Sequence, residues 1–261
     1  MLRLIRIWLV VVSRAAQDEV LNLGGAILFL IGKCARFGLY FVLLFTVLKE
    51  AGTLAGYTQT QVIFFLLVFN LIDILVQSLF RGVYHFRSLV INGDFDLDLL
   101  KPLPTFFRPL FGWADIIDLI TLIPLMGFFS WFVASNHLIS SFWHTLLFAF
   151  LLVNSLILAF SLHLMVCAVG LITMEVDHLV WIYRDIQNLA RLPTDIYPVG
   201  MRAVLTVIVP VIILITVPAK AFLGLLNWSG VVGSLMVTGL FLLVSWRFWN
   251  FALTKYSSAS S

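Results

Sequence analysis

The chain has 261 residues, of which 62% are hydrophobic and only 11% are charged. Soluble domains carry charge on roughly a quarter of their residues, so this composition excludes an ordinary soluble protein and predicts an integral membrane protein. The formal net charge of +3 is small, and we attribute it to membrane topology rather than to binding of nucleic acid.

The N-terminal segment combines basic residues with a short apolar run. Arg3 and Arg6 precede the apolar residues 7–12, and Arg14 follows where the small residues of a signal-peptide cleavage site would stand. We therefore expect residues 1–23 to form an uncleaved helix at the membrane interface, held there by its basic side chains.

Six stretches are long enough to cross a bilayer, which requires roughly 20 apolar residues in a helix. These predicted spans are residues 24–48, 61–80, 113–134, 142–174, 203–223 and 228–251. The short alternating segments typical of transmembrane β-barrels are absent from the sequence. We predict an all-α, polytopic membrane protein in which residues 1–261 form a single transmembrane domain.

Basic residues are concentrated in alternate loops, which the positive-inside rule assigns to the cytoplasm. The cytoplasmic set is Arg3, Arg6, Arg14, Arg81, Arg87, Lys101, Arg108, Arg184, Arg191, Arg202, Arg247 and Lys255. Lys49 and Lys220 remain outside. Both termini are then cytoplasmic, as an even number of spans requires.

Charged side chains also fall inside the first two predicted spans. Lys33 lies about 13 Å from the cytoplasmic end of the first span, and Asp73 lies about 12 Å from the cytoplasmic end of the second. Because these depths match, we predict that Asp73 forms an ion pair with Lys33 or Arg36, which would offset the cost of burying charge. Asp115 and Asp118, at the inner end of the third span, are interpreted as interfacial carboxylates.

The cytoplasmic loop between the second and third spans contains a predicted short helix. Asn92 or Asp94 can cap its start, and Pro102 prevents its continuation. Asp94 and Asp98 are four residues apart and therefore share one face of this helix, whereas Phe95 lies on a second, apolar face. An anionic inner leaflet would repel this acidic helix, so we expect it to face a protein partner. The predicted contact residues are Asp94, Phe95, Asp96, Leu97, Asp98, Leu99, Leu100 and Lys101.

The segment from Arg191 to Gly224 contains half of the eight prolines of the chain. They are Pro193, Pro198, Pro210 and Pro218. No uninterrupted helix can pass through this segment, and broken helices at membrane depth occur where they are buried in protein or line a water-filled cavity. The prolines therefore indicate a transport pathway, although an ordinary proline-kinked span explains them equally well.

Together, the acidic loop and the proline-rich segment resemble the permease subunits of ATP-binding cassette (ABC) exporters of the type 2 family, in particular a bacterial subgroup of it. The resemblance implies an exporter permease of the inner (plasma) membrane that forms a homodimer, or a heterodimer with a sister permease. It also implies two cytoplasmic ABC ATPase subunits as partners, with residues 94–101 as the coupling helix. ATP would be used by the partner subunits, because this chain has no GxxxxGK[ST] motif and is expected to bind no cofactor.

The resemblance also implies an alternative fifth span at residues 175–192, followed by a re-entrant segment at residues 198–222. Charge opposes this alternative, because Glu175, Arg184 and other charged residues would enter the membrane at about 2.5 to 3.5 kcal/mol each if unpaired. Side chains that face the interior of a dimer would escape most of this cost, so both positions of the fifth span stay open. In either case the chain crosses the membrane six times.

An intramembrane enzyme that acts on lipid or peptide is the alternative function. Such an enzyme needs a nucleophile with a base, paired carboxylates or metal ligands. The five histidines are scattered, HExxH and GxSxG motifs are absent, and Asp115 and Asp118 are the one weak match to a metal-binding pair. We therefore expect no catalytic residues and no metal site. We expect a pathway built from spans one, two and five and lined mainly by Leu, Val, Ile and Phe, which would suit an amphiphile or a hydrophobic drug.

Overall fold

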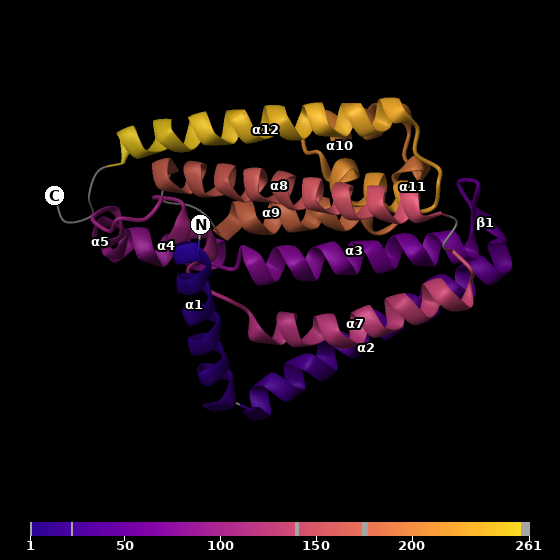
Figure 1. The fold of residues 1–261 in the computed structure, drawn as a ribbon, viewed down its shortest axis with the longest axis horizontal. Coiled ribbons are helices and arrows are strands. Elements are labelled where there is room, and N and C mark those ends of the chain that lie inside the picture. The colour runs from indigo at the N-terminus through magenta and orange to yellow at the C-terminus, as the bar shows by residue number, and fades with distance from the viewer. Residues whose placement is uncertain (1, 22, 139–140, 174–176, 257–261) are drawn as a thin grey trace.

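The computed structural model describes residues 2–21, 23–138, 141–173 and 177–256, and almost all of them are helical. Within these ranges, five helices are long and apolar enough to cross a membrane. They are α2 (Leu23–Ala51), α3 (Gln59–Leu79), α7 (Ile116–Ser135), α8 (Phe142–Thr173) and α12 (Trp228–Lys255). The predicted all-α, polytopic fold is confirmed, and Figure 1 shows α3, α8 and α12 running lengthwise through the molecule, with α2 slanting beside α7.

Shorter elements connect the long helices. The helices are α1 (Leu2–Leu21), α4 (Val83–Ile91), α5 (Asp94–Leu99), α6 (Phe107–Phe111), α9 (Asp177–Asn188), α10 (Val199–Val207) and α11 (Val217–Phe222). Three irregular turns are a 3-10 turn at Leu189–Arg191, a second at Thr194–Ile196 and a π-helical turn at Ile212–Thr216. Strands β1 (Thr53–Leu54) and β2 (Tyr57–Thr58) form a small antiparallel hairpin.

Local sequence signals fix the ends of several helices. Thr58 and Gln61 form a reciprocal capping box at the start of α3. The Asn227 side chain accepts a hydrogen bond from the Gly230 amide at the start of α12. The hairpin before α3 turns through Gly56, whose φ of 84° favours glycine. These caps and turns explain why the helices begin close to the predicted boundaries.

Helix α3 lies at the centre of the molecule, whereas α2 lies at its edge. In the most apolar stretch of α3, 72% of the residues are buried, compared with none in that of α2. Phe64 of α3 packs between Phe129 of α7 and Phe222 of α11, with ring centroids 5.5 and 4.8 Å away. Helix α8 packs against both α11 and α12. The core therefore surrounds α3 and α8, and α2 contacts it along one side.

Helix α1 points in a different direction from the long helices. Figure 1 shows α1 at a steep angle to the bundle, joined to the slanting α2 at a sharp corner. The start of α1, the end of α12 and helix α5 all lie at one end of the bundle, and the β1–β2 hairpin lies at the other. A separate helix thus precedes the first span, and its position at the membrane interface stays a prediction.

The proline-rich segment does not form one straight helix. The segments Val199–Val207 and Val211–Phe222 meet at an angle of 100°. Pro210 lies in the break between them, and Pro218 occupies the first turn of α11, where proline is well tolerated. The predicted span at residues 203–223 is thus bent sharply, as a broken span or a re-entrant loop would be.

Asp195 connects this segment to the hairpin at the end of α2. Its carboxylate accepts a hydrogen bond from the Tyr57 hydroxyl at 2.7 Å, and it lies 2.8 Å from the Lys220 ammonium and 3.7 Å from the Arg202 guanidinium. Burial and the neighbouring carboxylate raise the pKa of Tyr57. One carboxylate cannot lie at both faces of a membrane, so the assignment of Arg202 and Lys220 to opposite faces is wrong. Charge counting fails here because the chain folds back on itself.

The alternative fifth span falls on α9 and the 3-10 turn after it, although Glu175 lies outside the described residues. Arg191, near the end of this segment, donates a hydrogen bond to the Tyr40 hydroxyl and lies 5.3 Å from the centroid of the Phe69 ring. Arg184 lines a cavity that is described below. Both basic side chains are half-buried and have polar or aromatic neighbours, which lowers the cost that the sequence alone assigns to them.

Candidate functional site

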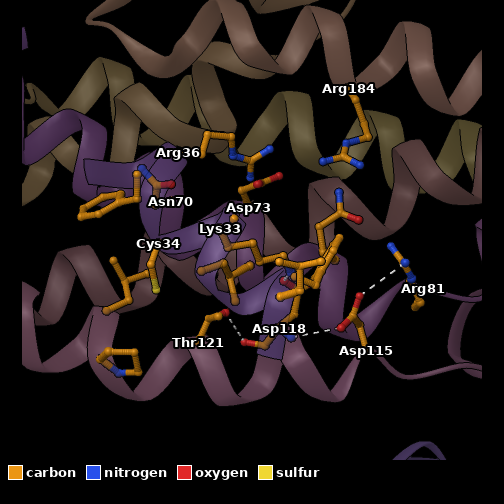
Figure 2. A pocket seen from close by; sticks show the side chains of 18 of the residues that line it. Lys33, Cys34, Arg36, Asn70, Asp73, Arg81, Asp115, Asp118, Thr121 and Arg184 are labelled. Carbon is orange, nitrogen blue, oxygen red and sulfur yellow. Dashed lines mark hydrogen bonds and ion pairs between the residues drawn. The ribbon is translucent and has the colours of Figure 1, made fainter. Parts of the chain in front are cut away.

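A cavity of about 1010 Å³ lies between α2, α3 and α7, with α4 and α9 at one end. Its charged lining residues are Lys33, Arg36, Asp73, Arg81, Asp115, Asp118 and Arg184. Figure 2 shows Arg36, Asp73 and Arg184 on one side of the cavity and Asp115, Asp118 and Thr121 on the other. Charged groups within a transmembrane bundle are rare and mark functional sites, so this cavity is the first part of the candidate site.

Lys33 has a different partner from the predicted one. Its ammonium group forms an ion pair with Asp118, which is only 4% exposed. In the described chain, no ion pair joins Asp73 to Lys33 or to Arg36, and this prediction is corrected accordingly. The physical reason is that α7 packs against α2, which brings a second carboxylate to the depth of Lys33.

The start of α7 holds both carboxylates in place. Asp115 caps the helix by accepting a hydrogen bond from the Asp118 amide at 3.1 Å, and its carboxylate lies 3.4 Å from the Arg81 guanidinium. Negative charge is favourable at a helix N-terminus, which offsets part of the cost of burial. Asp115 and Asp118 therefore link α7 to the α3–α4 junction and to α2. They are not simple interfacial carboxylates as predicted.

A polar stripe on α3 and α4 forms one wall of the cavity. The stripe consists of Asn70, Asp73, Gln77, Arg81 and Tyr84. Their spacing of three or four residues is the helical period, so this stripe was present in the sequence as a signal that the prediction did not use. The cavity lining is consequently more polar than the Leu, Val, Ile and Phe lining expected, and it comes from α2, α3 and α7.

The second part of the candidate site is α5, at the end of the bundle. Its Phe95 side chain is fully buried, with ring centroids 5.3 Å from Phe86, 6.3 Å from Trp249 and 5.4 Å from Tyr256. Gly93 precedes the helix with a φ of 75°, a conformation that allows the sharp turn after α4. A helix is thus present where the sequence predicts one, but its apolar anchor faces the bundle.

Asp98 is also directed inward. It is 7% exposed, and one of its oxygens accepts hydrogen bonds from Lys101 at 2.8 Å and from Arg108 at 2.9 Å. Asp94 is exposed, so the predicted acidic face shared by Asp94 and Asp98 is not presented to solvent as a unit. Burial and the nearby Asp96 carboxylate raise the pKa of the Tyr256 hydroxyl to about 12.

The outer surface of α5 is mainly apolar. Leu97 is 60% exposed and Leu100 is 82% exposed, and Leu99 and Ile91 lie beside them with 36% and 50%. Exposed leucines at the tip of a helix are costly in water and are typical of a docking surface. We call Ile91, Leu97, Leu99 and Leu100 the leucine tip.

Metal-binding geometry is not found in the described ranges, where no three His, Cys, Asp or Glu residues form a group that could hold an ion. Asp115 and Asp118, the weak match in the sequence, are engaged by Arg81 and Lys33.

Comparison with known families gives one match. The model of a family described as "ABC-2 family transporter protein" matches residues 35–260. The chain belongs to the ABC-2 transporter family. Comparisons with curated proteins and with solved structures found no match. The predicted resemblance to type 2 ABC permeases is therefore confirmed, and the match includes α5, the α3, α7 and α9 walls of the cavity and the bent α10–α11 segment.

ABC-2 family membership establishes the general role of the chain. It is a multi-pass membrane protein and a membrane component of an ABC transporter. The match begins at residue 35, so α1 and the first part of α2, including Lys33, lie outside it.

Proposed function

We propose that this chain is the permease subunit of an ATP-driven exporter and that two permeases, identical or sister chains, form the translocation path. Two cytoplasmic ABC ATPase subunits bind and hydrolyse ATP, and this chain binds no cofactor. The family match over residues 35–260, together with a short helix that exposes its leucines at one end of the bundle, is the observation that carries this proposal.

The proposed coupling element is α5 with the flanking residue Lys101. Phe95 and Asp98 fix the helix to the bundle, while the leucine tip is free to enter a groove of the ATPase. The Asp94 carboxylate, exposed at the start of the helix, adds a polar contact at the edge of this surface.

Movement of α5 has a continuous route to the cavity. Helix α5 contacts α4, and the junction before α4 carries Arg81, which is paired with Asp115 at the start of α7. One turn further along α7, Asp118 holds Lys33 of α2. We propose that ATP-driven displacement of α5 shifts α7 relative to α2 through these two ion pairs and thereby opens the path.

We place the protein in the inner (plasma) membrane. In the proposed topology, α5 and both chain termini face the cytoplasm. The fifth crossing is α9 with the 3-10 turn that follows it, and α10–α11 form a re-entrant segment that contains Pro210 and Pro218. The hydrogen bond between Tyr57 and Asp195 supports this topology, because it brings the residues just after α9 to the hairpin end of the bundle. Pro193 and Pro198 then separate the fifth crossing from the re-entrant segment.

Co-purification tests the proposed coupling. A tagged chain isolated from its native membrane in mild detergent should carry ATPase activity with it. The double variant Leu97→Asp, Leu100→Asp should lose at least about tenfold of this activity, because burial of a leucine side chain contributes about 1.5 to 3 kcal/mol and an aspartate in the same groove would bury an unpaired charge. The matched control is Leu225→Asp, which changes an exposed leucine in the link between α11 and α12, and Figure 1 shows this link at the end of the bundle opposite α5.

The co-purification test requires that the variants fold. The double variant and the Leu225→Asp control should keep a monodisperse elution profile and the helical circular dichroism of the parent. Undiminished ATPase association in a folded Leu97→Asp, Leu100→Asp variant would refute the assignment of α5 as the coupling element.

A further inference from the structure

We propose that the cavity between α2, α3 and α7 binds a monoanionic amphiphile, with the anionic headgroup between Arg36 and Arg184 and the alkyl chain along α2. This proposal names a substrate class for the permease and therefore rests on the proposed function. Its test measures binding alone, without ATP or an ATPase, so that the two proposals can fail separately.

The charge balance of the cavity determines the sign of the ligand. Four cationic and three anionic side chains line it. Two ion pairs, Lys33 with Asp118 and Arg81 with Asp115, neutralise four of these groups. The remaining Arg36, Arg184 and Asp73 form no ion pair within the described chain, and together they leave one positive charge. A single negative charge on the ligand would complete the balance.

The remaining arginines are suited to an oxyanion. Arg184 lies over the Trp181 and Tyr84 rings, at 5.5 and 6.0 Å from their centroids. Stacking uses the face of the guanidinium group and leaves its N–H edge available for a carboxylate or phosphate oxygen. Figure 2 shows Arg36 and Arg184 on the same side of the cavity, although they belong to different helices.

Two uncharged groups of the polar stripe lie behind the cavity wall. Gln77 is only 5% exposed, and its side-chain amide interacts with the Tyr84 hydroxyl. The polar atoms of both groups are closed off from the open space of the cavity, so the charged side chains select the ligand.

The rest of the cavity fits an alkyl chain. Leu28, Phe29 and Phe37 of α2 and Leu125 and Phe128 of α7 line it. Its volume of about 1010 Å³ is at the upper limit for small-molecule sites, so a headgroup and part of a chain fit together. No residue in the most apolar stretch of α2 is buried, so an alkyl chain can extend along this helix toward the surrounding lipid.

Quenching of Trp181 fluorescence by 9,10-dibromostearate tests the proposal on the purified full-length chain in neutral detergent. Bromine atoms quench only nearby tryptophans, and the Trp181→Phe variant defines the signal that comes from the cavity. We expect saturable quenching by the carboxylate and at least about tenfold weaker quenching by its uncharged methyl ester, because charge-assisted hydrogen bonds are strong. Butyrate, a soluble anion without a long chain, should not compete.

Charge variants test whether the net positive charge of the cavity favours binding of the anion. Arg36→Gln should weaken dibromostearate binding about tenfold, whereas Asp73→Asn should strengthen it severalfold by removing the offsetting negative charge. The control Arg247→Gln changes an exposed cation on α12 that does not line the cavity, and it should leave binding unchanged. A purely structural role of these residues predicts no gain for Asp73→Asn.

Three results would overturn the proposal: equal affinity for the acid and its ester, competition by butyrate at the same concentration as dibromostearate, or unchanged binding in a folded Arg36→Gln variant. If the amphiphile binds as expected but no ATPase co-purifies, the proposed permease coupling fails and the binding site stands.

Discussion

Asp98 has a structural role in α5 that its acidic character did not reveal. The buried carboxylate accepts hydrogen bonds from Lys101 and Arg108, whose side chains are 47% and 40% exposed. The pairs therefore combine a buried anion with partly solvated cations, and solvent screening reduces their strength. Asp98 holds the loop that follows α5 against the bundle, so reversing its charge would test folding of the loop rather than contact with a partner.

A double-mutant cycle measures this role. We expect Asp98→Asn to lower the free energy of unfolding by about 1 to 2 kcal/mol, because charged hydrogen bonds are lost but the cations can return to water. Arg108→Gln should cost a similar amount, and the double variant should cost clearly less than the sum of the two. Thermal unfolding in detergent, followed by tryptophan fluorescence, provides the measurement. Additive losses would show that the two side chains do not interact.

Lys33 illustrates what residue-level reasoning could and could not predict. Its depth in the first span correctly indicated that a buried cation needs a carboxylate at the same level. Depth alone cannot choose between carboxylates on different helices, and the choice of Asp118 over Asp73 depends on the packing of α7 against α2. The polar stripe from Asn70 to Tyr84 was, in contrast, readable from its spacing.

The junction between α3 and α4 is closely packed against the end of α6. Gly82 begins α4, and its amide donates a hydrogen bond to the Leu110 carbonyl at 3.1 Å. A Cβ atom at Gly82 would lie 2.5 Å from the Pro109 carbonyl oxygen and 2.9 Å from that of Arg108. Only glycine therefore allows α4 and α6 to approach so closely.

Two glycine substitutions test this junction. Gly82→Ala should destabilise the protein by about 1 to 3 kcal/mol, because backbone atoms must move to accommodate the methyl group. Gly127→Ala is the matched control, since a Cβ atom there meets nothing within 4 Å in the middle of α7. This control should be neutral or stabilising by up to about 1 kcal/mol, as alanine favours helix. Equal thermal stability of the two variants would contradict close packing at Gly82.

At the level of whole elements, the sequence predicts straight spans better than bent ones. Helices α2, α3, α7, α8 and α12 begin and end within a few residues of predicted spans, because hydrophobic length is a local property. The α10–α11 segment is also long and apolar enough for a crossing, but it bends by 100°. Prolines predicted a break there, but the direction of the chain after it depends on contacts such as Tyr57 with Asp195.

On the scale of the whole molecule, cysteine labelling tests which segments share a membrane face. In a background with Cys34→Ser and Cys167→Ala, Thr53→Cys and Gly200→Cys should react with a membrane-impermeant maleimide added to intact cells. Leu97→Cys should react only after permeabilisation. All three positions are exposed. The expectation follows from the hairpin and α10 lying at the end opposite α5 in the proposed topology. Labelling of positions 200 and 97 from the same side would instead favour residues 203–223 as the fifth crossing.

Photo-cross-linking tests our proposal that α5 transmits mechanical work from a separate ATPase subunit to this permease. A benzophenone maleimide is attached to Leu97→Cys or, as control, to Leu225→Cys in native membranes, and the cross-linked products are identified by mass spectrometry. We expect position 97 to capture a nucleotide-binding ATPase subunit and position 225 to capture none. Capture of lipid alone at position 97, or of the ATPase at position 225, would contradict the proposal.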